Sequence, residues 1–229
     1  MPESIPHSSS TQHILALLSF WASSAGRPLF VARNLAVRWL EARPAVGIDP
    51  DVCLLDPPPL EVESLSSLCL WKAGHLAPPL AFEVVSQSHP YKDYVGIQER
   101  YATIGTRELV VFDPLLQGPK SLGGPVLFQL WRRAADDLFE RMYSGPGPVF
   151  CETLEAWLAE EGGLLRISRD RAGHERWLTE QEYERAEKER ERAEKEQERA
   201  EKERERAARI ELERRIAEIE AKVGGKRST

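Results

Sequence analysis

Residues 80–114 read LAFEVVSQSHPYKDYVGIQERYATIGTRELVVFDP, and this stretch decides the fold class. It begins with an apolar and partly β-branched run, residues 80–86, which a single charged residue, Glu83, interrupts. Residues 93–104 then have the composition and apolar spacing of a helix that ends at a glycine, and residues 108–112 form a second apolar run. Strand, helix and strand with short connections indicate a crossover unit in an α/β sheet.

Further strands are predicted on both sides of this unit. Upstream, residues 51–56 (DVCLLD) are an apolar run of strand length with proline at both ends, which is typical of a buried strand. Residues 68–71 form another strand or part of a loop, and residues 29–40 form either a strand pair or a strand that enters a short helix. Downstream, residues 126–143 are expected to form a hairpin, and residues 150–177 a short helix and a last strand pair.

The N-terminal segment is expected to be unstructured before the first helix. Residues 1–11 are polar and rich in serine, so we predict a disordered lead-in to a folded domain over residues 12–177. Residues 12–24 suit a helix, and their apolar part, residues 14–22, is too short to cross a membrane. A signal peptide would need basic residues before it, and the first twelve residues contain none, so we expect this helix to lie on the core.

The last quarter of the chain has the composition of a long charged helix. Residues 178–223 contain repeats of the type RAEKERE, and residues 224–229 are expected to be a disordered tail. The helix has no apolar stripe over most of its length, so ion pairs four residues apart should support it, each by about 0.2–0.5 kcal/mol. These pairs are Glu184–Lys188, Glu191–Lys195, Glu198–Lys202, Glu205–Arg209 and Glu211–Arg215. A short apolar seam, able to support a weak homo-oligomer or bind a partner helix, is formed by Leu212, Ile216, Ile219 and Val223.

Charge and cysteine content restrict the partners and the compartment. Residues 179–229 hold 16 acidic and 15 basic side chains, so 21 of the 37 acidic and 16 of the 31 basic residues lie in the rest of the chain. Since non-specific binding to nucleic acid depends on clustered lysine and arginine, any nucleic-acid site in this acidic domain must be a local groove. Cys53, Cys69 and Cys151 have no zinc or disulfide spacing, which indicates buried thiols in a reducing compartment, the cytoplasm.

Two carboxylates carry the chemical signal. Asp51 opens one predicted buried strand and Glu83 lies inside another, where apolar side chains would be expected. A buried carboxylate is costly unless it is paired or binds a cation, and two carboxylates from adjacent strands can hold a magnesium ion. The alternative is that Glu83 pairs with an arginine and that Asp51 caps a turn.

Three blocks of sequence resemble a known family. PDVCLL at residues 50–55, PLAFEVVS at residues 79–86 and RYATIGTRELVVFDP at residues 100–114 resemble the Uma-two (Uma2) family, a branch of the PD-(D/E)XK nuclease superfamily. The resemblance covers roughly residues 12–165. It implies a restriction-endonuclease-like fold with a central mixed sheet flanked by helices. It also implies that Asp51 and Glu83 bind Mg²⁺ or Mn²⁺ and that the protein hydrolyses DNA phosphodiesters.

The chain departs from the superfamily pattern in its lysine. A PD-(D/E)XK site has lysine two residues after the glutamate, where this chain has Val85, as is usual in the Uma-two family. Family members often have a lysine on the next helix, four residues before the tyrosine, where this chain has Ile97. Lys92 is therefore the candidate for the catalytic cation and Arg100 the second choice. His89 could contact substrate or lie on the surface without a role.

Two functions remain open from the sequence. The first is a metal-dependent DNA endonuclease, with Asp51, Glu83 and Lys92 as its catalytic residues. The second is a nuclease-fold module that has lost catalysis and binds nucleic acid or a protein partner. The retained acid pair favours the enzyme, and the missing lysine favours the binding module.

Overall fold

The computed structural model describes residues 5–225, without the side chains of residues 5, 6, 63 and 218–225. It consists of two units, a folded domain that ends at Glu180 and a helical segment that begins at Gln181. Residues 1–4 of the predicted lead-in and residues 226–229 of the predicted tail lie outside this range.

A six-stranded mixed sheet forms the centre of the domain, with the strand order β1-β4-β6-β7-β8-β9. The strands are β1 (Phe30–Arg33), β4 (Val52–Leu55), β6 (Leu80–Val84), β7 (Glu108–Phe112), β8 (Phe128–Arg133) and β9 (Phe139–Gly145). Within this sheet, as the described residues form it, β6 and β7 are the one parallel pair, and α2 (Ile97–Ile104) connects them. The predicted crossover unit and the α/β fold class with a central mixed sheet are therefore confirmed.

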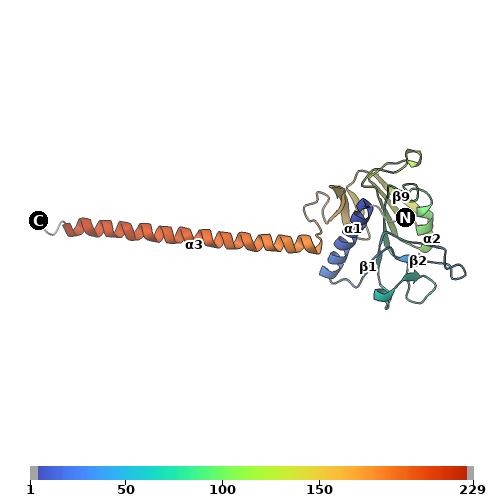
Figure 1. The fold of residues 1–229 in the computed structure, drawn as a ribbon, viewed down its shortest axis with the longest axis horizontal. Helices are drawn as coiled ribbons and strands as arrows, with labels where there is room; N and C mark the ends of the chain where they lie inside the picture. The colour runs from blue at the N-terminus through green and yellow to red at the C-terminus, as the bar shows by residue number, and fades with distance from the viewer. Residues whose placement is uncertain (1–4, 226–229) are drawn as a thin grey trace. The chain divides into compact units, whose positions relative to one another are not determined.

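Helices lie on both sides of the sheet (Figure 1), and each face of the sheet has its own apolar core. One face packs against α1 (Ile5–Ser24) and a three-stranded sheet of β10 (Val149–Cys151), β11 (Ala156–Glu161) and β12 (Leu164–Ser168). The other packs against α2 and a second three-stranded sheet of β2 (Ala36–Arg38), β3 (Gly47–Ile48) and β5 (Ser67–Cys69). Short 3-10 turns occupy Val62–Ser64 and Lys120–Leu122.

The alternation of side chains along β6 decides which face carries the candidate glutamate. Phe82 and Val84 belong to the core on the α1 side, and Ala81 and Val85 belong to the core on the α2 side. Because successive side chains of a strand point to opposite faces, Glu83 lies on the α2 side.

The first helix begins earlier than the sequence indicated. Residues 5–24 form one helix, so the prediction of disorder is wrong for residues 5–11. His7, Ser10 and Thr11 are buried, and they continue the stripe that Ile14, Leu17 and Leu18 form in the core. The serine content of this segment suggested a solvated chain, but its buried positions recur at helical spacing.

Two further segments differ from, or refine, the sequence-based expectation. Residues 152–155 form a turn and not a short helix, because Cys151 already pairs with Ala156 across β10 and β11 and leaves only four residues between the strands. Residues 29–40 contain two strands, as one alternative held, but these strands belong to different sheets.

The helical segment is α3 (Glu180–Gly225), which covers most of the range predicted as a charged helix. Ion pairs at four-residue spacing join Glu184–Lys188, Glu191–Lys195, Glu198–Lys202 and Glu211–Arg215, as predicted. Arg209 pairs with Glu213 and not with Glu205. Leu212 and Ile216 are exposed, and the side chains of Ile219 and Val223 lie outside the described residues, so the apolar seam stays a prediction.

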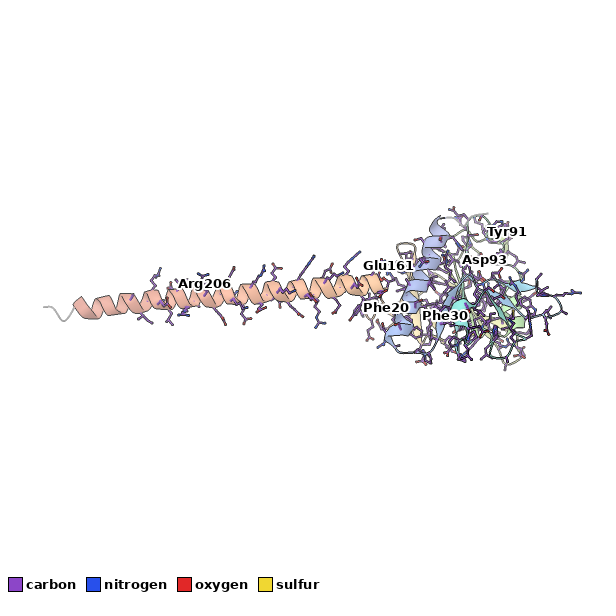
Figure 2. The ribbon with its side chains drawn as sticks, turned by 60° about the horizontal axis from the view of Figure 1, so that its bottom comes forward. Phe20, Phe30, Tyr91, Asp93, Glu161 and Arg206 are labelled. Carbon is purple, nitrogen blue, oxygen red and sulfur yellow. The ribbon has the colours of Figure 1, made fainter. Side chains whose placement is uncertain are left out.

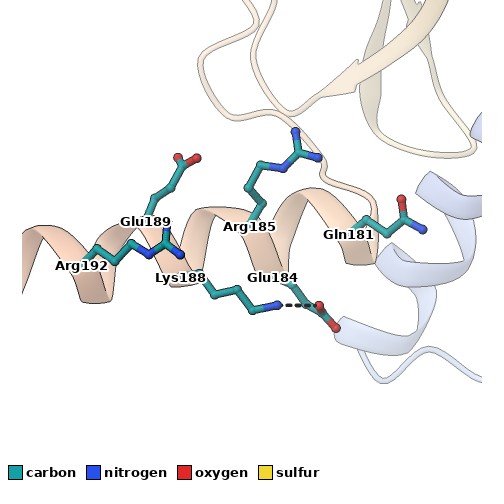
Figure 3. Close-up of a pocket in the computed structure, with 6 residues that line it drawn as sticks. All are labelled: Gln181, Glu184, Arg185, Lys188, Glu189 and Arg192. Carbon is teal, nitrogen blue, oxygen red and sulfur yellow. Dashed lines mark hydrogen bonds and ion pairs between the residues drawn. The ribbon is translucent and has the colours of Figure 1, made fainter.

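Figure 3 shows the first turns of α3, where six long side chains surround a shallow hollow. All six come from consecutive turns of this one exposed helix, and Glu184 and Lys188 are joined by an ion pair of 3.3 Å. The hollow is therefore a gap between solvated side chains and offers no enclosed binding site.

All three cysteines are buried free thiols, as expected. Across the residues that the structure describes, no helix has both the length and the apolar content needed to span a membrane.

Candidate active site

The register of the central sheet places Asp51 opposite Glu83. β4 and β6 are antiparallel, with Val52 paired to Phe82 and Cys53 paired to Ala81. One further step along this register brings Asp51, directly before β4, to the position opposite Glu83. Residues that face each other in an antiparallel pair share a face of the sheet, with Cβ atoms about 4.5–5.5 Å apart. The two candidate acids therefore lie on neighbouring segments of the sheet, Asp51 directly before β4 and Glu83 within β6.

The Asp51 carboxylate is held against the backbone of the glutamate strand. Its Oδ2 atom accepts a hydrogen bond of 2.7 Å from the backbone N–H of Val84, the residue after Glu83. The same oxygen lies 3.1 Å from Nε2 of His7 in α1. Asp51 is only 7% exposed, so α1 and β6 together fix a buried carboxylate.

Glu83 is completely buried and only partly satisfied. The Tyr101 hydroxyl, from α2, donates a hydrogen bond of 2.6 Å to Oε1. Among the described residues, Oε2 has no hydrogen-bond partner. Burial raises the pKa of Glu83 well above its usual value, and the negative charges of Asp51 and Asp93 raise it further. The sequence left open an ion pair between Glu83 and an arginine, but among the described residues Glu83 forms no such pair.

A third acid and one lysine share the electrostatic environment of this pair. Asp93 is 3% exposed, and burial raises its pKa to about 7, although Lys92 and His7 lower it. The charge of Lys92 lowers the pKa of Glu83, as does the hydrogen bond from Tyr101. In return, the charges of Glu83, Asp93 and Asp51 outweigh the desolvation of Lys92 and raise its own pKa. Figure 2 labels Asp93 and the exposed Tyr91, which both belong to the loop between β6 and α2.

The other candidates from the sequence are either exposed or part of the apolar core. Arg100 is exposed on α2. His89 is exposed in the loop after β6, where its backbone N–H donates a hydrogen bond to Ser86 Oγ. Val85 and Ile97, at the two positions where lysine was considered, are buried in the core on the α2 side.

Three residues of the cluster were not identified as site residues from the sequence. His7 lies in the segment predicted to be disordered, Asp93 opens the predicted helix of residues 93–104, and Tyr101 enters the sequence argument only as part of the family pattern. The available signals were the helical spacing of residues 7, 10, 11 and 14, and the adjacency of Asp93 to the candidate Lys92.

Comparison with known proteins agrees with the resemblance seen in the sequence. The Uma2 family model, described as "Putative restriction endonuclease", matches residues 1–118, which is more than half of the chain. No curated protein matches. One similar solved structure is described as "a putative nuclease belonging to DUF820" from Anabaena variabilis. Its sequence identity is 14% and its TM-score is 0.45, and the alignment covers 67% of this chain and 75% of that chain.

Proposed function

We propose, because this chain belongs to the Uma2 family of restriction-endonuclease-like proteins, that it is a divalent-metal-dependent endonuclease that hydrolyses DNA phosphodiester bonds. The observation that carries the proposal is the pair of Asp51 and Glu83, two buried carboxylates of which the first bonds to the backbone N–H of Val84, the residue after the second. Proteins rarely bury such a pair unless a cation or another positive group compensates its charge.

The donor set fits Mg²⁺ or Mn²⁺. Among the described residues, no three His, Cys, Asp or Glu side chains form a ready-made metal cluster. Magnesium does not need one, because one or two carboxylates usually bind it together with waters and substrate phosphates. Oε2 of Glu83, a buried oxygen without a hydrogen-bond partner among the described residues, is an atom that a cation would satisfy. Asp51 and Glu83 would hold such an ion, and its chemistry there would be to activate water and to offset charge on the scissile phosphate.

The chain's own residues set the geometry and the local charge. Tyr101 holds one oxygen of Glu83, which leaves the second oxygen for a ligand. Lys92 is kept protonated by the surrounding acids and can offset the negative charge that develops on the phosphate. The Lys92 side chain is accessible to solvent, so its ammonium can reach a substrate that approaches from solvent.

A second function has specific support. Val85 and Ile97 are core residues, so neither position used by related nucleases can supply the lysine. If Lys92 does not replace it, the domain is a catalytically impaired module that binds nucleic acid or a protein partner.

DNA is the proposed substrate. The cytoplasm is the proposed compartment, because the cysteines are buried free thiols. The exposed Leu212 and Ile216 of α3 belong to the proposed seam for a weak homo-oligomer or a partner helix. The domain itself carries the proposed chemistry.

The proposal is tested by a cleavage assay on plasmid and single-stranded DNA with Mg²⁺ or Mn²⁺. We expect cleavage by the wild type and none by Asp51→Ala or Asp51→Asn. Asp56→Asn is the matched control, because Asp56 ends the same strand segment but is exposed. DNA binding by the wild type without cleavage under any of these conditions would favour the binding module.

A further inference from the structure

His7 lies at the start of α1, yet its ring is next to an acid 44 residues away in sequence. Nε2 is 3.1 Å from Oδ2 of Asp51, and both residues are buried. A carboxylate oxygen can only accept a hydrogen bond, so Nε2 carries the proton and donates it.

The two hydrogen bonds to Asp51 come from different elements but end on the same atom. The Val84 N–H and the His7 ring both bind Oδ2, and these two directions fix the plane of the carboxylate. Oδ1 takes no part in either bond. Metal-binding carboxylates are commonly oriented by such outer hydrogen bonds, which hold them in the geometry that a cation needs.

The first turn of α1 is itself anchored beside Asp51. Arg33, on β1, donates a hydrogen bond of 3.2 Å to Ser8 Oγ, and Arg33 pairs with Val52, the residue after Asp51. Farther along the helix, Ile14 and Leu17 are fully buried in the core. The start of α1 is therefore held by the Arg33–Ser8 hydrogen bond and by the buried Ile14 and Leu17. The contact between His7 and Asp51 is made by an anchored helix and not by a mobile chain end.

We propose that His7 is a positioning residue of the metal site: its Nε2–H holds Oδ2 of Asp51 so that the carboxylate is oriented for the divalent cation. This inference rests on the proposed function, because it assumes that Asp51 binds the cation. It adds that α1, the segment whose composition suggested disorder, is part of the functional site.

The test measures Mn²⁺ binding to the full chain by electron paramagnetic resonance of the free ion. His7→Ala should weaken binding by about 10–100-fold, the usual range for loss of an outer-shell partner. His7→Gln should restore most of the affinity, because the glutamine amide carries an N–H that can donate to Oδ2. His13→Gln is the matched control: His13 lies on the same helix, but its ring contacts the backbone oxygen of Leu165. It should bind Mn²⁺ like the wild type.

Each other outcome has a defined meaning. Wild-type affinity in His7→Ala overturns the inference, as does an equal loss in His7→Ala and His7→Gln. If Asp51→Asn abolishes Mn²⁺ binding while His7→Ala does not change it, the proposed function stands and only the role of His7 falls. If the wild type does not bind Mn²⁺, both fall.

A measurement on the unsubstituted protein covers the case in which His7→Ala does not fold. The ¹⁵N shifts of the His7 ring should show the tautomer with the proton on Nε2. A neutral ring with its proton only on Nδ1 cannot donate to Asp51 and overturns the inference.

Discussion

Substitution of Asp93 by asparagine should make the metal-free protein more stable, and the gain should grow with pH. Asp93 is buried, and its pKa rises from 3.8 to about 7, with burial as the largest cause. A carboxyl whose pKa is raised in the folded state binds its proton more tightly there than in the unfolded chain. The folded state therefore loses stability as pH rises from about 4 to 7, and the full penalty is present above pH 7.

The size of the effect follows from the same two values. One pKa unit corresponds to about 1.4 kcal/mol, so the raised pKa of Asp93 lowers the stability of the folded state by about 4 kcal/mol at pH 8 and about 2 kcal/mol at pH 5. Asparagine is close in shape, stays neutral and can still accept a hydrogen bond from the backbone of Ser86. Asp93→Asn should recover these amounts. A gain of about 4 kcal/mol is large against a usual total of about 5–15 kcal/mol.

The assay is urea unfolding in EDTA at pH 5 and pH 8, followed by tryptophan fluorescence. All six tryptophans lie at or before position 177, so the signal reports on the domain and not on α3. Asp56→Asn removes the same charge from an exposed site, where ion pairs contribute little, and should change stability only slightly. An equal gain for Asp93→Asn at both pH values, or no gain at pH 8, would refute the reasoning.

Four further outcomes are expected. Lys92→Ala should reduce DNA cleavage at least about 10-fold; full activity, with Asp51→Ala inactive, would mean that another group supplies the positive charge. Tyr101→Phe should lower the free energy of unfolding by about 1–3 kcal/mol, because the buried Glu83 loses its donor; an unchanged urea midpoint would contradict this. Mg²⁺ should raise the thermal midpoint of the wild type at pH 8 but not that of the Asp51→Asn protein, and equal shifts in a melting experiment would argue against a site at Asp51. A peptide of residues 178–229 should be a helical monomer that loses helicity in about 1 M salt, whereas a tight, salt-insensitive dimer in sedimentation would show a coiled coil.

The central part of the fold could be predicted because local signals and tertiary structure agree there. Residues 108–112 were predicted as a strand with the bounds of β7, and the strands predicted at 51–56 and 80–86 contain β4 and β6. Apolar runs of strand length ended by proline or glycine leave few alternatives. Turn geometry between paired strands is not visible in this way, and the short helix expected within residues 150–177 is therefore wrong.

The candidate site was only half visible in the sequence. Asp51 and Glu83 stood out because each is charged within an apolar strand, and the family pattern gave them a role. His7 and Asp93 lie in a serine-rich segment and in a loop, where polar residues are ordinary. Only the packing of α1 and the loop before α2 against the sheet shows that both are buried.

The position of the positive charge follows from the same packing. A lysine at Val85 or Ile97 would start in the apolar core on the α2 side, where desolvation opposes its charge. Lys92 comes from the loop instead, so its ammonium can remain partly solvated while Glu83 and Asp93 act on it. Desolvation lowers the pKa of Lys92, but the charges of the nearby acids raise it by more, so the pKa lies above its usual value. A permanently protonated lysine cannot act as a general base at neutral pH. Its expected contribution is therefore electrostatic, and Lys92→Arg should retain more activity than Lys92→Ala if the charge itself is what the reaction needs.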